Sequence, residues 1–143
     1  MIIIQIKKLS ISAIIPKYAH LGDSGMDLYS NERIVIESHD RGLVHTGIAM
    51  AIPEGYEGCI RPRSGNALKL GLTVLNTPGT VDSNYRGEIG VILYNTNDHA
   101  LVIEPGDRIA QMVIQEVPSI VLEEVDDLDN TDRGTGGFGS TGR

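Results

Sequence analysis

The stretch Glu88-Ile-Gly-Val-Ile-Leu-Tyr94 is a short apolar run with a glycine, Gly90, inside it. Similar runs recur along the chain, separated by Gly, Pro, Asn and Asp. The others are Ile2–Ile6, Ile34–Ile36, Leu43–Ile52, Gly58–Ile60, Thr73–Leu75, Leu101–Ile103, Ile109–Val117 and Ile120–Val125. Short apolar runs bounded by turn residues predict an all-β protein, built as a sandwich or a barrel.

The length of 143 residues suits one domain with a core of its own. Aromatic residues make up only 4% of the chain and Trp is absent, so Ile, Val and Leu must build that core, which favours strands. One short helix is expected from Ser64 to Leu70, closed by Gly71. We therefore predict a single β domain over residues 1–125 and a flexible, Gly-rich C-terminal arm over residues 126–143.

The composition limits which kinds of partner the chain can bind. A net charge of -7 argues against binding nucleic acid through its phosphate backbone, although a few aimed donors and a divalent cation can still hold a small polyphosphate. No apolar run approaches the ~18 residues of a membrane span. The single Cys59 cannot form an internal disulfide, which suits a reducing cytoplasm.

The C-terminal stretch Arg133-Gly-Thr-Gly-Gly-Phe-Gly-Ser-Thr-Gly-Arg143 places one aromatic ring among glycines. Such a tail is costly to order, so a ligand would have to compensate when it docks. Backbone N–H groups, the hydroxyls of Ser140 and Thr141 and the charge of Arg133 suit phosphates, and Phe138 suits a base. The alternative interpretation is a frayed terminus.

Two common nucleotide-binding motifs are excluded. Gly134, Gly136 and Gly139 match the spacing of a dinucleotide fingerprint, but no strand precedes them and too few residues follow for a helix. The chain also lacks a P-loop sequence. The four histidines lie far apart, and none stands at a zinc-ligand spacing from Cys59, so we expect most of them on the surface.

Three internal segments could carry chemistry, each with an ordinary structural alternative. Arg63-Ser-Gly65 precedes a helix start, where anions bind, but could be a helix cap beside an exposed arginine. Asn76–Gly90 predicts a hairpin in which Gly90 allows close approach of a ligand, but Asp82 and Tyr85 could simply be turn and packing residues. Gly106–Gln111 could simply be a turn that enters a strand.

Taken in order, five segments resemble the motifs of the homotrimeric dUTPase family (deoxyuridine triphosphate nucleotidohydrolases). They are Gly22-Asp-Ser-Gly-Met-Asp-Leu28, Arg63-Ser-Gly65 with Lys69 and Gly71, Gly79-Thr-Val-Asp-Ser-Asn-Tyr-Arg-Gly87, Gly106-Asp-Arg-Ile-Ala-Gln111 and Arg133–Thr141. The resemblance covers the chain from about residue 19 to its end. Met26, Asn84, Ser24 and Asn66 depart from the residues that are usual in the family.

The resemblance implies a jelly-roll, β-barrel-like subunit in a homotrimer with shared active sites. It implies Mg²⁺-dependent hydrolysis of dUTP to dUMP and pyrophosphate, which limits uracil incorporation into DNA and supplies dUMP for dTMP synthesis. By position, Asp82 is the catalytic residue and Asp27 acts on the metal through water. The implied substrate-binding residues are Arg63, Ser64, Gly65, Asn76, Gly79, Thr80, Val81, Asp82, Tyr85, Gly90, Gln111, Arg133, Phe138, Gly139 and Ser140.

Two other functions remain open at this point. The dCTP deaminases share the fold and similar motifs, but they need a general acid/base Glu near the base, and Asn76-Thr-Pro-Gly79 offers none. A nucleotide-gated binding protein could use the same scaffold to hold a partner. The combination of Arg63, Asp82, Gln111 and Phe138 favours a catalytic function.

Overall fold

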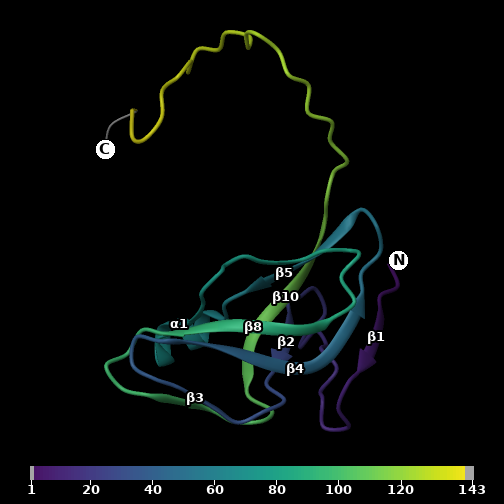
Figure 1. Cartoon of the computed structure of the whole chain (residues 1–143), viewed down its shortest axis with the longest axis vertical. Coiled ribbons are helices and arrows are strands. Elements are labelled where there is room, and N and C mark those ends of the chain that lie inside the picture. The colour runs from purple at the N-terminus through teal and green to yellow at the C-terminus, as the bar shows by residue number, and fades with distance from the viewer. Residues whose placement is uncertain (1, 141–143) are drawn as a thin grey trace.

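A computed structural model describes residues 2–140 of the chain. Within them, strands alternate with loops and one short helix (Figure 1). The elements are β1 (Gln5–Lys8), β2 (Met26–Tyr29), β3 (Ile34–Ile36), β4 (Arg41–Ala51), β5 (Tyr56–Arg61), α1 (Ser64–Leu70), β6 (Leu72–Val74), β7 (Gly79–Val81), β8 (Glu88–Asn95), β9 (Leu101–Ile103) and β10 (Arg108–Glu116). The prediction of an all-β chain is thus confirmed.

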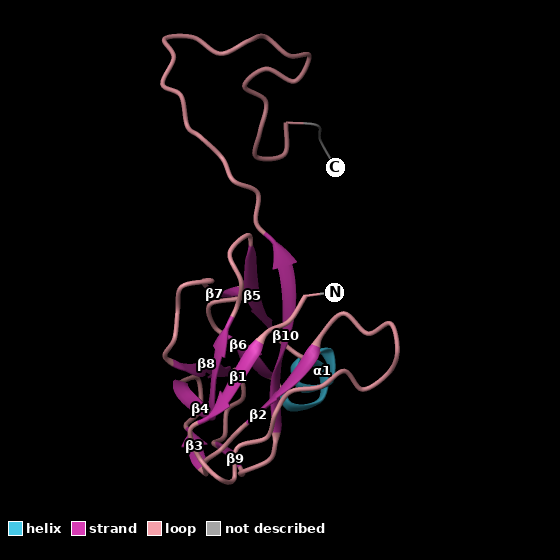
Figure 2. Ribbon diagram, turned by 90° about the vertical axis from the view of Figure 1, so that its right-hand side faces the viewer, coloured by secondary structure: helices cyan, strands magenta, loops and turns pink. Residues whose placement is uncertain are grey.

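The strands form two four-stranded sheets, ordered β1-β4-β8-β6 and β2-β10-β5-β7, and a small β3-β9 sheet. Every pairing is antiparallel. Figure 2 shows the strands gathered into one body, with α1 at its side. The sheets stay open, so β7 lies at the end of its sheet, and within the described part of the chain only one of its edges pairs with a strand.

The core lies between the sheets and is aliphatic, as the low aromatic content predicts. Side chains alternate along β8, where Ile89, Val91 and Leu93 are buried. They belong to the same cluster as Leu28 of β2 and Met112 of β10. Alternate residues of a strand point to opposite faces, so β8 contributes one face to this core and leaves the other for a different use.

The apolar runs located most strands, but Ile120–Val125 forms none and its side chains are exposed. A strand needs a hydrogen-bonded partner, and this segment runs away from the body (Figure 1). Two short strands, β2 and β7, were missed. Both lie in segments that were assigned to motifs and turns, where apolar residues are too few to indicate a strand.

Helix α1 has the predicted bounds, and Gly71 closes it in the left-handed conformation with φ 59°. The cap at its start is Arg63, which makes no side-chain capping hydrogen bond, so the alternative of a Ser64 cap is wrong. Asn66 ties the helix to the body, since its Nδ2 donates to the Arg108 main-chain oxygen at 2.8 Å.

Just after β10, Val117 N donates to Gly55 O at 2.8 Å. Further along, up to residue 140, the chain leaves the body, and its main-chain hydrogen bonds are those of local turns. Gly134 N donates to Thr131 O, and Gly136 N donates to Arg133 O, both at 3.0 Å. Figure 1 shows this segment arching clear of the sheets. Thr141, which was expected to donate to phosphate, lies outside the described residues. Within residues 2–140 the structure contains no helix with the length and apolar character of a membrane span.

Candidate active site

Two hollows collect most of the predicted site residues. The first, which we call the β7–β8 cleft, has a volume of about 180 Å³. The site residues that line it are Asn76, Gly79, Thr80, Val81, Asp82, Tyr85 and Gly90. They are joined there by Glu88 and by apolar side chains, including Ile60 and Val74. The segment expected to form a hairpin therefore does build one concave surface.

The strand pairing explains the chemistry of the β7–β8 cleft. β7 pairs with β5 along one edge, with Gly79 opposite Ile60 and Val81 opposite Gly58. Its other edge faces no strand of residues 2–140, so N–H and C=O groups on that side are not used by the sheet. A free strand edge offers main-chain donors and acceptors in a fixed order, which can recognise a flat polar molecule. The segment predicted as a hairpin is closed by β6 and β8, which pair with each other.

Tyr85 stands beside this edge in a turn that Asp82 begins. The Tyr85 main-chain N–H donates to Asp82 O at 3.1 Å, and the Tyr85 hydroxyl donates to Glu88 O at 2.9 Å. Its ring lies directly on Gly87, where an added Cβ would come within 2.9 Å of the ring atom Cε2 and closer still to two other ring-end atoms. Glycine is needed at position 87 because the ring occupies the space of a side chain.

The second hollow, which we call the α1 cleft, is polar and lies at the start of the helix. The site residues that line it are Asp27, Arg63, Ser64, Gly65 and Gln111, together with Arg108. β10 brings them together because it runs between β2 and β5, so that Gln111 lies opposite Asp27 on one side and Arg61 on the other.

An ion pair dominates the α1 cleft. Arg63 Nε lies 2.7 Å from Asp27 Oδ1, with side chains only 24% and 18% exposed. Arg108 Nη1 lies 3.5 Å from the other oxygen, Asp27 Oδ2. The Asp27 carboxylate lies between two guanidinium groups, and each guanidinium carries further N–H donors that suit an anion. No role was predicted for Arg108, although it lies in the segment Gly106–Gln111.

Close packing fixes Gln111 in the same cleft. Gln111 Nε2 donates to the Pro62 main-chain oxygen at 2.9 Å. A Cβ on Gly25 would collide with the Gln111 side-chain amide, so the amide can lie here only because residue 25 is glycine. One of the two Gln111 amide hydrogens is therefore used to hold the side chain, and the other is available for a ligand.

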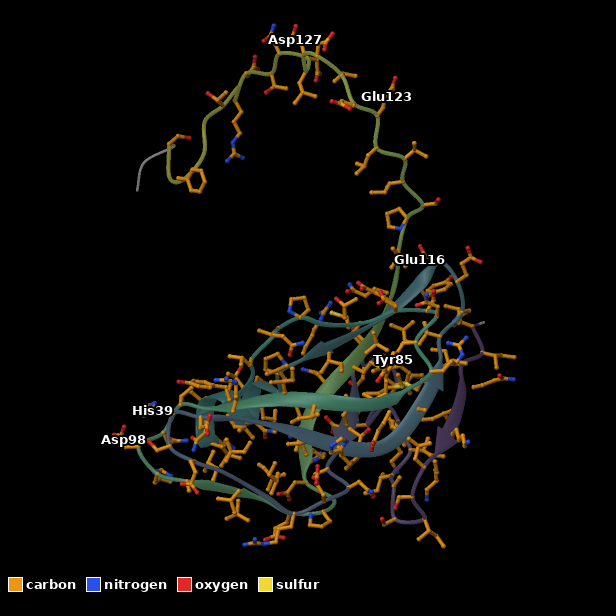
Figure 3. All side chains as sticks on the ribbon, viewed as in Figure 1. His39, Tyr85, Asp98, Glu116, Glu123 and Asp127 are labelled. Carbon is orange, nitrogen blue, oxygen red and sulfur yellow. The ribbon has the colours of Figure 1, made fainter. Side chains whose placement is uncertain are left out.

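A single chain does not bring all the predicted residues together. Asp82 lines the β7–β8 cleft, whereas Arg63 and Asp27 line the α1 cleft. Phe138 is fully exposed on the arm, and Arg133 Nε donates to Gly136 O at 2.8 Å rather than to any residue of the body. Figure 3 shows the arm well away from Tyr85, with Glu123 and Asp127 along it. Gly139 and Ser140 lie on the same exposed segment.

The histidines are exposed, as predicted. Two of them contact carboxylates: His39 Nε2 lies 2.9 Å from Asp98 Oδ1, and His45 Nδ1 lies 3.1 Å from Glu88 Oε2. Figure 3 places His39 and Asp98 at the end of the body remote from Tyr85. Among residues 2–140, no three or more His, Cys, Asp or Glu side chains gather as metal ligands.

The site has three features of a nucleotide-binding protein: free main-chain groups at a strand edge, an adjacent carboxylate and a cleft lined by arginines. The family model described as dUTPase matches residues 12–142. The chain therefore belongs to the dUTPase family.

Individual relatives agree along nearly the full length. The chain is 52% identical to the deoxyuridine 5'-triphosphate nucleotidohydrolase of Syntrophotalea carbinolica over 143 residues, which cover 99% of this chain and 97% of the relative. It is 56% identical to the enzyme of the same name from Hydrogenobaculum sp. over 138 residues, or 96% of each chain.

A similar solved structure is the dUTPase of Staphylococcus bacteriophage 80alpha with dUPNHPP, at a TM-score of 0.91 and 31% identity over 99% of each chain. Another is a variant dUTPase of phage phi11 of S. aureus, described with a structural Mg(II) ion, at a TM-score of 0.82 and 27% identity over 87% of this chain and 97% of that one. These likenesses confirm the predicted jelly-roll-like fold of the family.

Proposed function

We propose that this chain is a dUTP diphosphatase, which hydrolyses dUTP to dUMP and pyrophosphate by attack of water on the α-phosphorus. The observation that carries the proposal is the free edge of β7, with Asp82 and Tyr85 at its end. This activity limits uracil incorporation into DNA and supplies dUMP for dTMP synthesis. The single buried Cys59 without a disulfide suits a cytoplasmic enzyme.

The base is chosen by hydrogen-bond polarity. The alternating C=O and N–H groups of β7, from Gly79 to Val81, match the acceptor, donor and acceptor of the uracil edge. Cytosine carries the opposite polarity at two of these places, and buried mismatches of this kind can discriminate by roughly 10⁴-fold. Asn76 and Gly90 complete the pocket for base and sugar.

Tyr85 selects the sugar. Its ring is held by Glu88 O and by Gly87, and it would lie against C2′ of the nucleotide. A ribose hydroxyl then has no room, so deoxynucleotides are preferred. Tyr85→Ala should therefore reduce the discrimination between dUTP and UTP, which competing hydrolysis rates measure directly. Unchanged discrimination would contradict the contact.

Asp82 is the catalytic residue. Its carboxylate orients the attacking water and accepts its proton as a general base. Much of the rate comes from placing this water in line with the α-phosphorus. Arg63, Ser64, Gly65 and Gln111 stabilise the negative charge that develops on the phosphates.

Mg²⁺ fits the oxygen ligands of the α1 cleft, which is lined by two carboxylates, Asp23 and Asp27. A magnesium ion that keeps several waters and binds through triphosphate oxygens needs no cage of protein ligands. Asp27 would hold the ion through its water shell, and the ion would neutralise phosphate charge. The ion pair with Asp27 meanwhile holds Arg63 in position to meet the same phosphates.

The complete site is shared in a homotrimer, with no nucleic acid or membrane partner. Support comes from the separation of Asp82 and Arg63 into two clefts and from the arm that leaves its own body. We propose residues 1–125 as the β domain and residues 126–143 as the lid. An extended chain from residue 130 to 143 reaches about 45 Å, enough to cover a neighbouring subunit's site. Arg133, Phe138, Gly139 and Ser140 would then close over the nucleotide.

The experiment that tests the function is incubation of the full chain with each deoxynucleoside triphosphate and Mg²⁺, followed by pyrophosphate detection. Release from dUTP alone is expected. Ammonia release from dCTP would instead indicate a deaminase. A partner pulldown with and without dUTP distinguishes an enzyme from a nucleotide-gated binding protein. The binding protein would capture a partner without hydrolysing dUTP.

A further inference from the structure

Glu88 contacts both the Tyr85 side chain and strand β4. Its main-chain oxygen accepts the hydroxyl of Tyr85 at 2.9 Å. Its side chain points to β4, where Oε1 accepts the Gly47 N–H at 2.8 Å and Oε2 lies 3.1 Å from His45 Nδ1. As the first residue of β8, it also lines the β7–β8 cleft.

The carboxylate of Glu88 completes an irregularity in β4. The register of β4 against β8 shifts between His45 and Ala49, and Gly47 there has φ 70°. A bulge of this kind leaves main-chain groups without ladder partners. Glu88 supplies the acceptor for the Gly47 N–H, and Glu32 accepts the His45 N–H at 2.8 Å. The carboxylates of Glu88 and Glu32 therefore stabilise the bulge by accepting its main-chain N–H groups.

The same residue sets the position of the Tyr85 ring. The ring touches Gly87 on one side, and its hydroxyl is tied to Glu88 O. Any movement at the start of β8 therefore shifts the ring. A ring that shifts away from the nucleotide would leave room beside C2′ for a ribose hydroxyl.

We infer that the contacts of Glu88 with His45 and Gly47 fix the Tyr85 ring over the sugar and so set the discrimination against ribonucleotides. Glu88 is a positioning residue, because it acts through Tyr85. The inference rests on the proposed function, in which Tyr85 meets C2′.

The test measures kcat/KM for dUTP and for UTP in purified full-length variants, together with the thermal midpoint. Glu88→Ala removes both side-chain contacts, and the dUTP/UTP ratio should fall about tenfold as UTP becomes acceptable. Glu88→Gln should keep the ratio within about threefold of the parent, because its amide oxygen can still accept from Gly47 and its N–H can meet His45 Nδ1. If Glu88→Ala does not fold, His45→Ala removes one anchor and should give a smaller fall.

The matched control is Asp98→Ala, which breaks the other histidine–carboxylate pair at the far end of the body. Its ratio should equal that of the parent. A folded Glu88→Ala protein with a lower thermal midpoint but an unchanged ratio overturns the inference. If Tyr85→Ala lowers the ratio in the same assay, the proposed sugar contact still stands. If Tyr85→Ala also leaves the ratio unchanged, the sugar contact itself fails.

Discussion

The β7–β8 cleft and the C-terminal arm are proposed to hold the same nucleotide, yet they are built in opposite ways. In the cleft, Tyr85 is fixed by two hydrogen bonds and by contact with Gly87. On the arm, Phe138 is fully exposed and the hydrogen bonds are local. The body can present a preformed surface before a ligand arrives, whereas the arm gains its contacts only when one is bound. Recognition and closure are therefore separable, and each can be broken alone.

The largest expected effect is on chemistry in the cleft. Asp82→Asn should lower kcat by roughly 10²–10⁴-fold because the general base is lost, while dUTP binding stays nearly intact. Steady-state kinetics and equilibrium binding of dUTP would measure both. Asp98→Asn makes the same chemical change on a remote, exposed carboxylate and should leave both unchanged. Near-normal turnover in Asp82→Asn would remove Asp82 from the base role.

Removal of the lid should lower activity nearly as much as Asp82→Asn does and should leave stability unchanged. Deletion of residues 131–143 is expected to lower kcat/KM for dUTP by about 10²-fold or more, because water is no longer excluded and the phosphates lose donors. The thermal midpoint and the number of subunits in the oligomer should match those of the full chain. A fully active truncated protein would show that the arm takes no part in the reaction.

A substitution in the core should lower stability, whereas removal of the lid should lower activity. Leu93→Ala in the centre of β8 is expected to lower the free energy of unfolding by about 2–5 kcal/mol, since Leu93 is completely buried. Denaturant unfolding at a fixed protein concentration measures it. Leu21→Ala, at an exposed loop position, should stay within about 0.5 kcal/mol of the parent. Equal losses in both variants would contradict the core described here.

The smallest effect is expected in the α1 cleft. Gly25→Ala places a methyl group against the Gln111 amide and should raise KM for dUTP about tenfold, with the fold unaffected. Ser24→Ala only removes a hydroxyl from the neighbouring residue and adds no atom against Gln111, so it serves as the control. A normal KM for Gly25→Ala would mean that Gln111 does not need its observed position.

The sequence predicted the all-β fold and helix α1 because apolar periodicity and a closing glycine are local signals. It failed for Ile120–Val125, where an apolar run met no strand to pair with, and for β7, whose three residues carry little apolar signal. The sequence did not indicate the roles of Arg108 and Glu88, and the reason is a different one. Their contacts with Asp27 and His45 join strands that are distant in sequence, and only the register of the sheets creates them.

The central claim, a preformed cleft closed by a ligand-ordered arm, is tested most directly by amide hydrogen exchange with and without a non-hydrolysable dUTP analogue and Mg²⁺. We predict that the amides of β8 exchange slowly in both states. Amides of residues 133–140 should exchange freely without nucleotide and slow at least tenfold with it. Arm amides that exchange equally fast in both states, under conditions where the analogue is bound, would contradict the account.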